Sequence, residues 1–134
     1  FNRAVLEALP YLGTKISEIY VNDWHTSMIP LILNVDYKYH SFYQKVKTTL
    51  NIHNLEYQGW YSVDILPNVL GICRQYYDNG LTRMGDSVNL LKSGIETATR
   101  IQLNEISTEQ LKLPQMHESG IASVIEGKLN NKAS

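Results

Sequence analysis

The sequence predicts a single α/β domain built around a parallel β-sheet. Helix-like and strand-like segments alternate along the chain, as they do when each helix carries the chain back to begin the next parallel strand. The chain has 134 residues and is 43% hydrophobic, which is enough for one core. We therefore expect residues 1–134 to form one domain.

The first two elements are predicted from an apolar stripe and an apolar run. Residues 1–9 are expected to form an amphipathic helix, because their apolar residues recur at helical spacing. Pro10 should end or bend this helix. A short strand is expected over about residues 18–22. The apolar stripe consists of Phe1, Ala4, Val5, Ala8 and Leu9.

A helix and a second strand are expected next. The helix covers residues 27–34, with Asp23 or Thr26 as its N-cap. Pro30 fits that helix only near its first turn, where the missing N–H costs little. Residues 46–53 are rich in β-branched side chains and are expected to form a strand.

The middle of the chain is less regular. Residues 62–72 are expected to hold a short apolar helix interrupted by Pro67. Residues 75–86 are loop-like, and Asn79-Gly80 is a strong turn signal. The paired Tyr76-Tyr77 is expected at a surface or an interface, as are the aromatic residues of 37–43.

The last third is expected to hold a helix, a strand and a helix. Ser87–Thr99 has the clearest helical period, and Asp86 is its expected N-cap. Residues 99–107 are expected to contain a third strand, and residues 120–129 a last short helix.

Composition argues against several classes of partner. The net charge is −1, with 12 basic and 13 acidic residues, so neither nucleic acid nor another polyanion is an expected partner. Cys73 stands alone, which excludes an internal disulfide and a cysteine-rich zinc cluster and fits a reducing compartment. We see no apolar run of about 18 residues, so no membrane partner is expected. The first helix begins at Phe1 without a preceding cap, which suggests a piece of a larger protein.

Two polar clusters follow two of the expected strands. Asp23-Trp24-His25 ends the first, and residues 53–59, which include His53, end the second. In open parallel sheets, ligands bind beyond the carboxyl ends of the strands. If the strands are neighbours, both clusters share one rim, whose acids, amides and aromatic faces suit a polyhydroxylated ligand.

Each cluster residue also has a plain structural interpretation. Asp23 can be a helix cap, His25 and His53 can be structural histidines, and Trp24 can belong to the core. Asp23, His25 and His53 could also hold a divalent metal, but the spacing supports this weakly, and no metal is expected. Neither a phosphate-binding loop nor a Gly-x-Ser-x-Gly nucleophile turn is present.

Three ordered strings resemble the amino-terminal domain of bacterial glycogen synthases and plant starch synthases. They are VNDWHT at 21–26, IHNLEYQGWY at 52–61 and GDSVNLLKSGI at 85–95, and the opening FNRAVLEALPYL is similar to the family helix before them. Glu56 departs from the family, where a small residue is usual. Residues 101–112 depart as well, which leaves their strand register open.

The resemblance implies a fold and an activity. It implies part of a Rossmann-like, three-layer domain from the amino-terminal half of a GT-B glycosyltransferase, with the carboxyl-terminal nucleotide-binding domain absent. It implies a cytoplasmic bacterial enzyme of glycogen biosynthesis that transfers glucose from ADP-glucose to an α-1,4-glucan with retention of configuration. UDP-glucose is the other possible donor, and no cofactor is implied.

The resemblance also assigns roles to residues. His53 is the implied catalytic residue, orienting the donor glucose. Asp23 and His25 would contact the acceptor glucan or hold His53, and Gly59 would allow a tight turn. Lys92 is expected to be structural. The implied substrate-binding residues are Asp23, His25, Asn54, Tyr57, Gln58 and Gly59.

Two alternatives to this function stay open. One is a stand-alone glucan-binding module without transferase activity, and the other is a related transferase that uses another donor. The motif strings argue against the second. If the chain is a fragment of a synthase, it is expected to be inactive alone and to self-associate through its exposed interdomain face.

Overall fold

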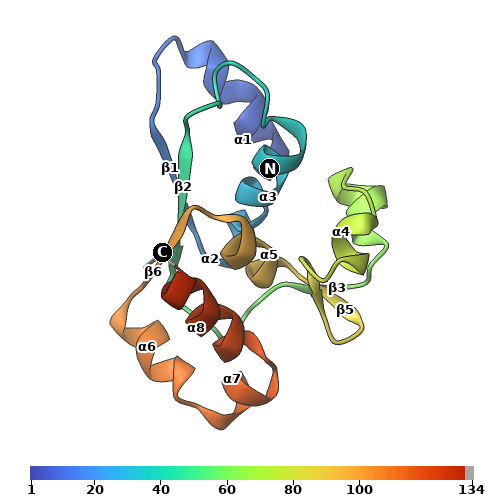
Figure 1. Ribbon diagram of the computed structural model, residues 1–134, viewed down its shortest axis with the longest axis vertical. Coiled ribbons are helices and arrows are strands. Elements are labelled where there is room, and N and C mark those ends of the chain that lie inside the picture. Colours follow the sequence, from blue (N-terminus) through green and yellow to red (C-terminus); the bar gives the residue numbers. More distant parts are fainter. Residues whose placement is uncertain (132–134) are drawn as a thin grey trace.

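The centre of the chain is a parallel sheet of three strands, seen in a computed structural model that describes residues 1–131 (Figure 1). The strands are β1 (Glu18–Asn22), β2 (Lys47–Ile52) and β6 (Arg100–Leu103), in the order β1-β2-β6. Asn22 lies opposite Asn51 in the first pair, and Asn51 lies opposite Gln102 in the second. The predicted α/β class with a parallel sheet is confirmed, and the pairing fixes the register of β6.

Helices gather on one side of this sheet (Figure 1). The predicted helices near residues 1–9, 27–34 and 120–129 are confirmed, and Pro30 lies in the first turn of its helix. A 3-10 turn at Leu9–Leu12 follows the first helix and contains Pro10. The helices are α1 (Asn2–Ala8), α2 (Asp23–Thr26), α3 (Met28–Asp36), α4 (Gln75–Asp78), α5 (Leu90–Thr97), α6 (Glu105–Leu111), α7 (Pro114–Glu118) and α8 (Ile121–Asn131), with a π-helical turn at Leu66–Leu70.

A small antiparallel sheet, which the sequence analysis missed, precedes α5. It consists of β3 (Trp60–Tyr61), β4 (Arg83–Met84) and β5 (Ser87–Asn89), in the order β3-β5-β4. The helix predicted from Ser87 therefore begins later, at Leu90, and Asp86 is not its cap. Val88 is fully buried in β5, so its apolar side chain serves a strand rather than a helix.

Several aromatic residues expected at the surface are buried. Tyr37, Tyr43 and Tyr77 are each less than 10% exposed. The Tyr43 hydroxyl donates to the carbonyl of Leu6 at 2.6 Å, and burial raises the pKa of Tyr43 to about 12. These rings can be buried because each hydroxyl keeps a hydrogen-bond partner. In α1 the buried residue is Leu6, while Phe1 of the predicted stripe is exposed.

The two faces of the parallel sheet differ in character. Toward the helices the strands present buried apolar residues, including Val21, Leu50 and Ile101. On the other face the Arg100 guanidinium contacts the Glu18 carboxylate at 2.9 Å and the Thr49 hydroxyl at 2.9 Å. The pKa of Glu18 is lowered, chiefly by the hydrogen bond from Thr49 and also by the Arg100 charge. Apolar and polar side chains therefore alternate along these strands, whereas parallel strands that are covered on both faces are apolar throughout.

The start of α3 packs closely against α5. The Ser27 hydroxyl donates to the carbonyl of Leu90 at 2.6 Å. A Cβ added at Gly94 would lie 2.5 Å from the Ser27 carbonyl oxygen and 2.7 Å from the Ser27 Cβ. Gly94 therefore sets how near α5 can approach the start of α3.

We expect Gly94→Ala to destabilise the chain by about 1–3 kcal/mol, because the new methyl group must push two backbones apart. Chemical denaturation measures the change in the free energy of unfolding. Gly127→Ala is the matched control, since a Cβ at this helical glycine of α8 meets nothing within 4 Å. The control should be neutral or stabilising by up to about 1 kcal/mol. Equal effects of the two changes would contradict the close approach.

Candidate functional site

The two polar clusters meet at the carboxyl ends of β1 and β2, as predicted. Asp23 directly follows β1, and its Oδ1 accepts hydrogen bonds from the backbone N–H of His53 at 2.6 Å and of Asn54 at 3.3 Å. Its Oδ2 lies 3.2 Å from Nδ1 of the His53 ring. One carboxylate therefore ties the end of β1 to the loop that follows β2.

Asp23 holds this position through an unusual backbone conformation. Its φ is +59°, the one positive value at a non-glycine residue among residues 1–131. Aspartate tolerates this left-handed region better than most residues because its short side chain can bond locally. Such outliers persist where the surroundings fix them, and they gather at functional sites.

The helix-cap interpretations of Asp23 and Thr26 are wrong. The residue before α3, Ser27, makes no side-chain cap bond to it, and the Asp23 carboxylate is directed to the neighbouring loop instead. The Thr26 hydroxyl accepts from the N–H of Asn22 at 2.9 Å and donates to its carbonyl at 2.8 Å. Asp23 has tertiary partners instead of a helix to cap, and Thr26 bonds back to the backbone of Asn22, four residues earlier.

An open pocket of about 330 Å³ lies beside this junction. The Trp24 ring stacks on His25 with centroids 4.1 Å apart, and Tyr57 is 64% exposed. Aromatic faces beside carboxylate and amide groups suit a hydroxyl-rich ligand, and the volume lies at the lower end of the usual range for small-molecule sites. The lining residues are Asp23, Trp24, His25, Asn54 and Tyr57.

His53 lies beside a second hollow, of about 300 Å³, where β2 and β6 end. Its side chain is 51% exposed, so the ring is open to a ligand. The nearby carboxylate favours the neutral tautomer with the proton on Nδ1, which leaves Nε2 as an acceptor. The ring is thus oriented by Asp23, whereas His25 stacks on Trp24.

Gln58 and Gly59 form the end of the loop of residues 53–59. Gln58 is only 5% exposed, and its amide donates to the carbonyl of Leu55 at 2.9 Å, so in this structure it lies under the rim rather than on it. Gly59 has φ +73°, and a Cβ there would lie 2.8 Å from Cε3 of Trp24. Gly59 therefore has a left-handed backbone and a close approach to Trp24 that a side chain would obstruct.

Two supports of this loop were missed by sequence reasoning. The side-chain oxygen of Gln110 in α6 accepts a hydrogen bond from the backbone N–H of Leu55 at 2.5 Å. No local sequence pattern predicts this contact for a glutamine within a helix. Asn89 accepts the N–H of Lys92 at 2.8 Å as the N-cap of α5. Asparagine is a favoured N-cap, so this signal was present but was assigned to Asp86.

Lys92 is structural, as expected. Its Nζ donates to the carbonyls of Gly80 and Arg83, each at 2.6 Å, and burial lowers its pKa. These hydrogen bonds connect the turn after α4 and the strand β4 to α5.

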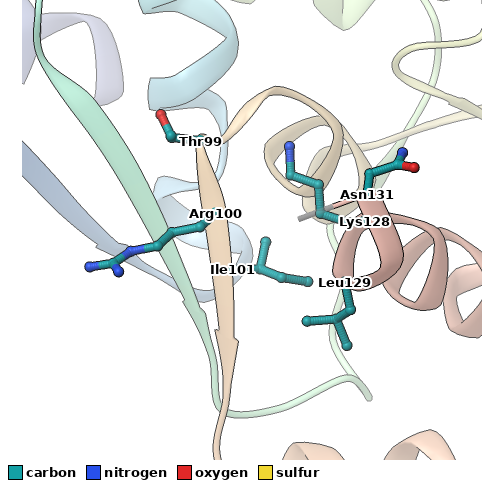
Figure 2. A pocket seen from close by; sticks show the side chains of 6 residues that line it. All are labelled: Thr99, Arg100, Ile101, Lys128, Leu129 and Asn131. Carbon is teal, nitrogen blue, oxygen red and sulfur yellow. The ribbon is translucent and has the colours of Figure 1, made fainter. Parts of the chain in front are cut away.

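Other hollows are poorer candidates for a ligand site. Figure 2 shows one of about 80 Å³ between β6 and α8, with Ile101 near Leu129 and Lys128 while Arg100 points away across the sheet. That volume is too small for a sugar ring. A hollow of about 530 Å³, lined by loop residues that include Lys15 and Lys45, lies near the amino ends of β1 and β2, away from both polar clusters.

Residues 1–131 contain no group of three or more His, Cys, Asp or Glu side chains placed to hold a metal ion. Over the same residues, no helix has the length and apolar content needed to cross a membrane.

Comparison with known proteins gives matches within one protein family. The model of the family described as starch synthase catalytic domain matches residues 1–125. The glycogen synthase of Caldicellulosiruptor saccharolyticus is 35% identical over 133 residues, which cover 95% of this chain and 27% of that protein. The glycogen synthase of Clostridioides difficile is 38% identical over 147 residues, covering 99% of this chain and 31% of that protein.

The solved structures support the fold. The catalytic domain of starch synthase IV from Arabidopsis thaliana, bound to ADP and acarbose, superposes with a TM-score of 0.80 at 23% identity, over 96% of this chain and 27% of that one. This chain thus spans less than a third of each of these proteins.

We expect Asp23→Ala to release the loop after β2. The change removes the acceptor for two backbone N–H groups and leaves alanine in a left-handed conformation, so it should cost about 2–4 kcal/mol of folding free energy. Asp23→Asn is the matched control, because asparagine tolerates the same conformation and keeps one acceptor oxygen, and it should cost less than half as much. Denaturation gives both values, and amide exchange at His53 and Asn54 locates the effect. Unchanged exchange at both amides in Asp23→Ala would contradict the conclusion that the Asp23 carboxylate holds the loop after β2.

Proposed function

The chain belongs to the family of starch synthase catalytic domains, and we propose that it serves a retaining glucosyltransferase that elongates an α-1,4-glucan with glucose from ADP-glucose. The relatives' names and the ADP and acarbose bound to the solved starch synthase IV support this proposal. The observation that carries it is the Asp23–His53 junction beside an open aromatic pocket.

The chain spans 27–31% of the length of the relatives compared above, and we propose that the activity belongs to a longer protein. Within residues 1–131 no phosphate-binding cluster of cations lies at the pocket, whose lining residues are Asp23, Trp24, His25, Asn54 and Tyr57. Stabilising the departing nucleoside diphosphate is the largest electrostatic demand of such a reaction. We therefore propose that residues outside this chain meet that demand and that the chain by itself is inactive.

His53 is the residue we propose to face the donor glucose. The Asp23 carboxylate lies 3.2 Å from Nδ1 of the ring, which leaves the other ring nitrogen able to bind a sugar hydroxyl. Asp23 also binds the His53 N–H, so the backbone of the loop cannot shift independently of the ring. A reacting sugar placed by such fixed groups needs less reordering to reach its transition state.

We expect His53→Ala to lower glucose transfer by about a hundredfold or more, roughly 2.7 kcal/mol in the barrier. The measurement is transfer of glucose from ADP-glucose to glycogen by the longest native polypeptide that carries this chain, with circular dichroism to confirm folding. His117→Ala is the control, because His117 is an exposed histidine on α7 outside the pocket. Near-normal turnover in His53→Ala with the fold intact would remove His53 from the donor site.

A second candidate function is glucan binding without transfer. The pocket of about 330 Å³ favours it, because all five lining residues belong to this chain. On this hypothesis the chain alone should bind a maltooligosaccharide, and Tyr57→Ala should weaken that binding by about tenfold through the lost ring face. Calorimetric titration measures both affinities. An absence of binding by the chain alone would exclude this second function and leave the transferase proposal standing.

A further inference from the structure

Two buried carboxamides connect the loop of residues 53–59 to the start of α5. Asn89 is fully buried and Gln58 is 5% exposed. The Asn89 Nδ2 donates to Gln58 Oε1 at 2.8 Å. The two side chains therefore form one direct contact between segments 31 residues apart in the sequence.

The other ends of both amides are also engaged. Asn89 Oδ1 accepts the N–H of Lys92 at 2.8 Å, which caps α5. Gln58 Nε2 donates to the carbonyl of Leu55 at 2.9 Å. The chain of bonds thus runs from a backbone N–H of α5, through both amides, to a backbone carbonyl of the loop.

The backbones of the same two segments are joined as well. The N–H groups of Leu90 and Leu91 donate to the carbonyls of Gly59 at 2.9 Å and Gln58 at 3.0 Å. The first N–H groups of a helix have no partner inside it, and here the loop and Asn89 supply the partners. The loop is therefore held against α5 by side-chain and backbone bonds together.

This arrangement gives Gln58 a role other than the substrate contact first expected of it. A residue whose amide is buried and bonded at both ends has no free group to offer a ligand. His53 and Tyr57 lie on the same loop, one tied to Asp23 and the other exposed at the pocket. The position of both depends on where the loop rests.

We propose that Gln58 and Asn89 are positioning residues, a buried amide relay that holds the loop of residues 53–59 on α5 and so places Tyr57 at the pocket and His53 at the neighbouring hollow where β2 and β6 end. This inference rests on the proposed transferase function for its effect on activity, but its structural part stands apart from it. If either amide is lost, the other is left buried with an unpaired polar atom.

Amide hydrogen exchange of the chain itself tests the structural part. The variants are Gln58→Met, which keeps the length and removes both amide bonds, Asn89→Ser, which keeps a good N-cap and loses the reach to Gln58, and the double variant. Ile125→Val, a buried change in α8 away from the loop, is the control for general loss of stability.

Each single change should speed exchange at the Leu55 and Leu91 amides about tenfold relative to the control, after correction for global stability. The double variant should exchange no faster than the faster single variant, because both changes break one relay. Additive effects, or loop exchange no faster than in Ile125→Val, would overturn the relay. Should Gln58→Met fail to fold, Asn89→Ser decides the matter alone by the same comparison.

Glucose transfer by the longest native polypeptide tests the effect on activity. Both single changes should lower kcat about tenfold with little change in KM for the donor, since the loop is displaced in the same way by each. A loss in Gln58→Met with none in Asn89→Ser would overturn positioning and return Gln58 to direct substrate contact. If the unaltered polypeptide transfers no glucose, the proposed function fails, and the exchange result decides the relay by itself.

Discussion

The carboxylate of Asp23 joins the ends of two parallel strands that lie 30 residues apart in the sequence. It accepts two backbone N–H groups and faces a histidine ring with its second oxygen. Parallel pairing of β1 with β2 makes this possible, because it brings Asn22 beside Asn51 and leaves Asp23 within reach of the His53 N–H. One wall of the pocket, the placement of His53 and the beginning of the loop all depend on that one side chain.

The rest of the site is built to keep the loop after β2 in place. Asp23 holds its beginning, Gln110 holds the N–H of Leu55, and α5 holds its end through Asn89 and Gln58. Gly94 lets α5 approach the Ser27 backbone, and Gly59 lets the loop pass Trp24. Much of the support for the candidate catalytic residue therefore comes from buried polar groups and from the absence of side chains at two glycines.

Much of this arrangement could be predicted from the sequence. Strand β1 has the bounds expected of it, and the shared rim follows from the general rule that parallel strands end on the same side. What failed were choices between local and tertiary partners. From its position in the sequence Asp23 is predicted to be a helix cap. In the structure its carboxylate instead accepts two N–H groups of the neighbouring loop. Val88 fits a helical period, yet pairing with β3 makes it a strand residue, and no local pattern announces that pairing.

The ion pair of Arg100 with Glu18 has a bearing on how the sheet can associate with anything else. Covering that face with an apolar layer would strip water from two charges and a phenol, since Tyr20 also bonds to Glu18. A polar or hydrated surface laid over it would keep those groups solvated. The apolar face of the three strands packs on the helices, whereas the polar face disfavours contact with apolar surfaces. An exposed polar face of this kind reduces non-specific aggregation.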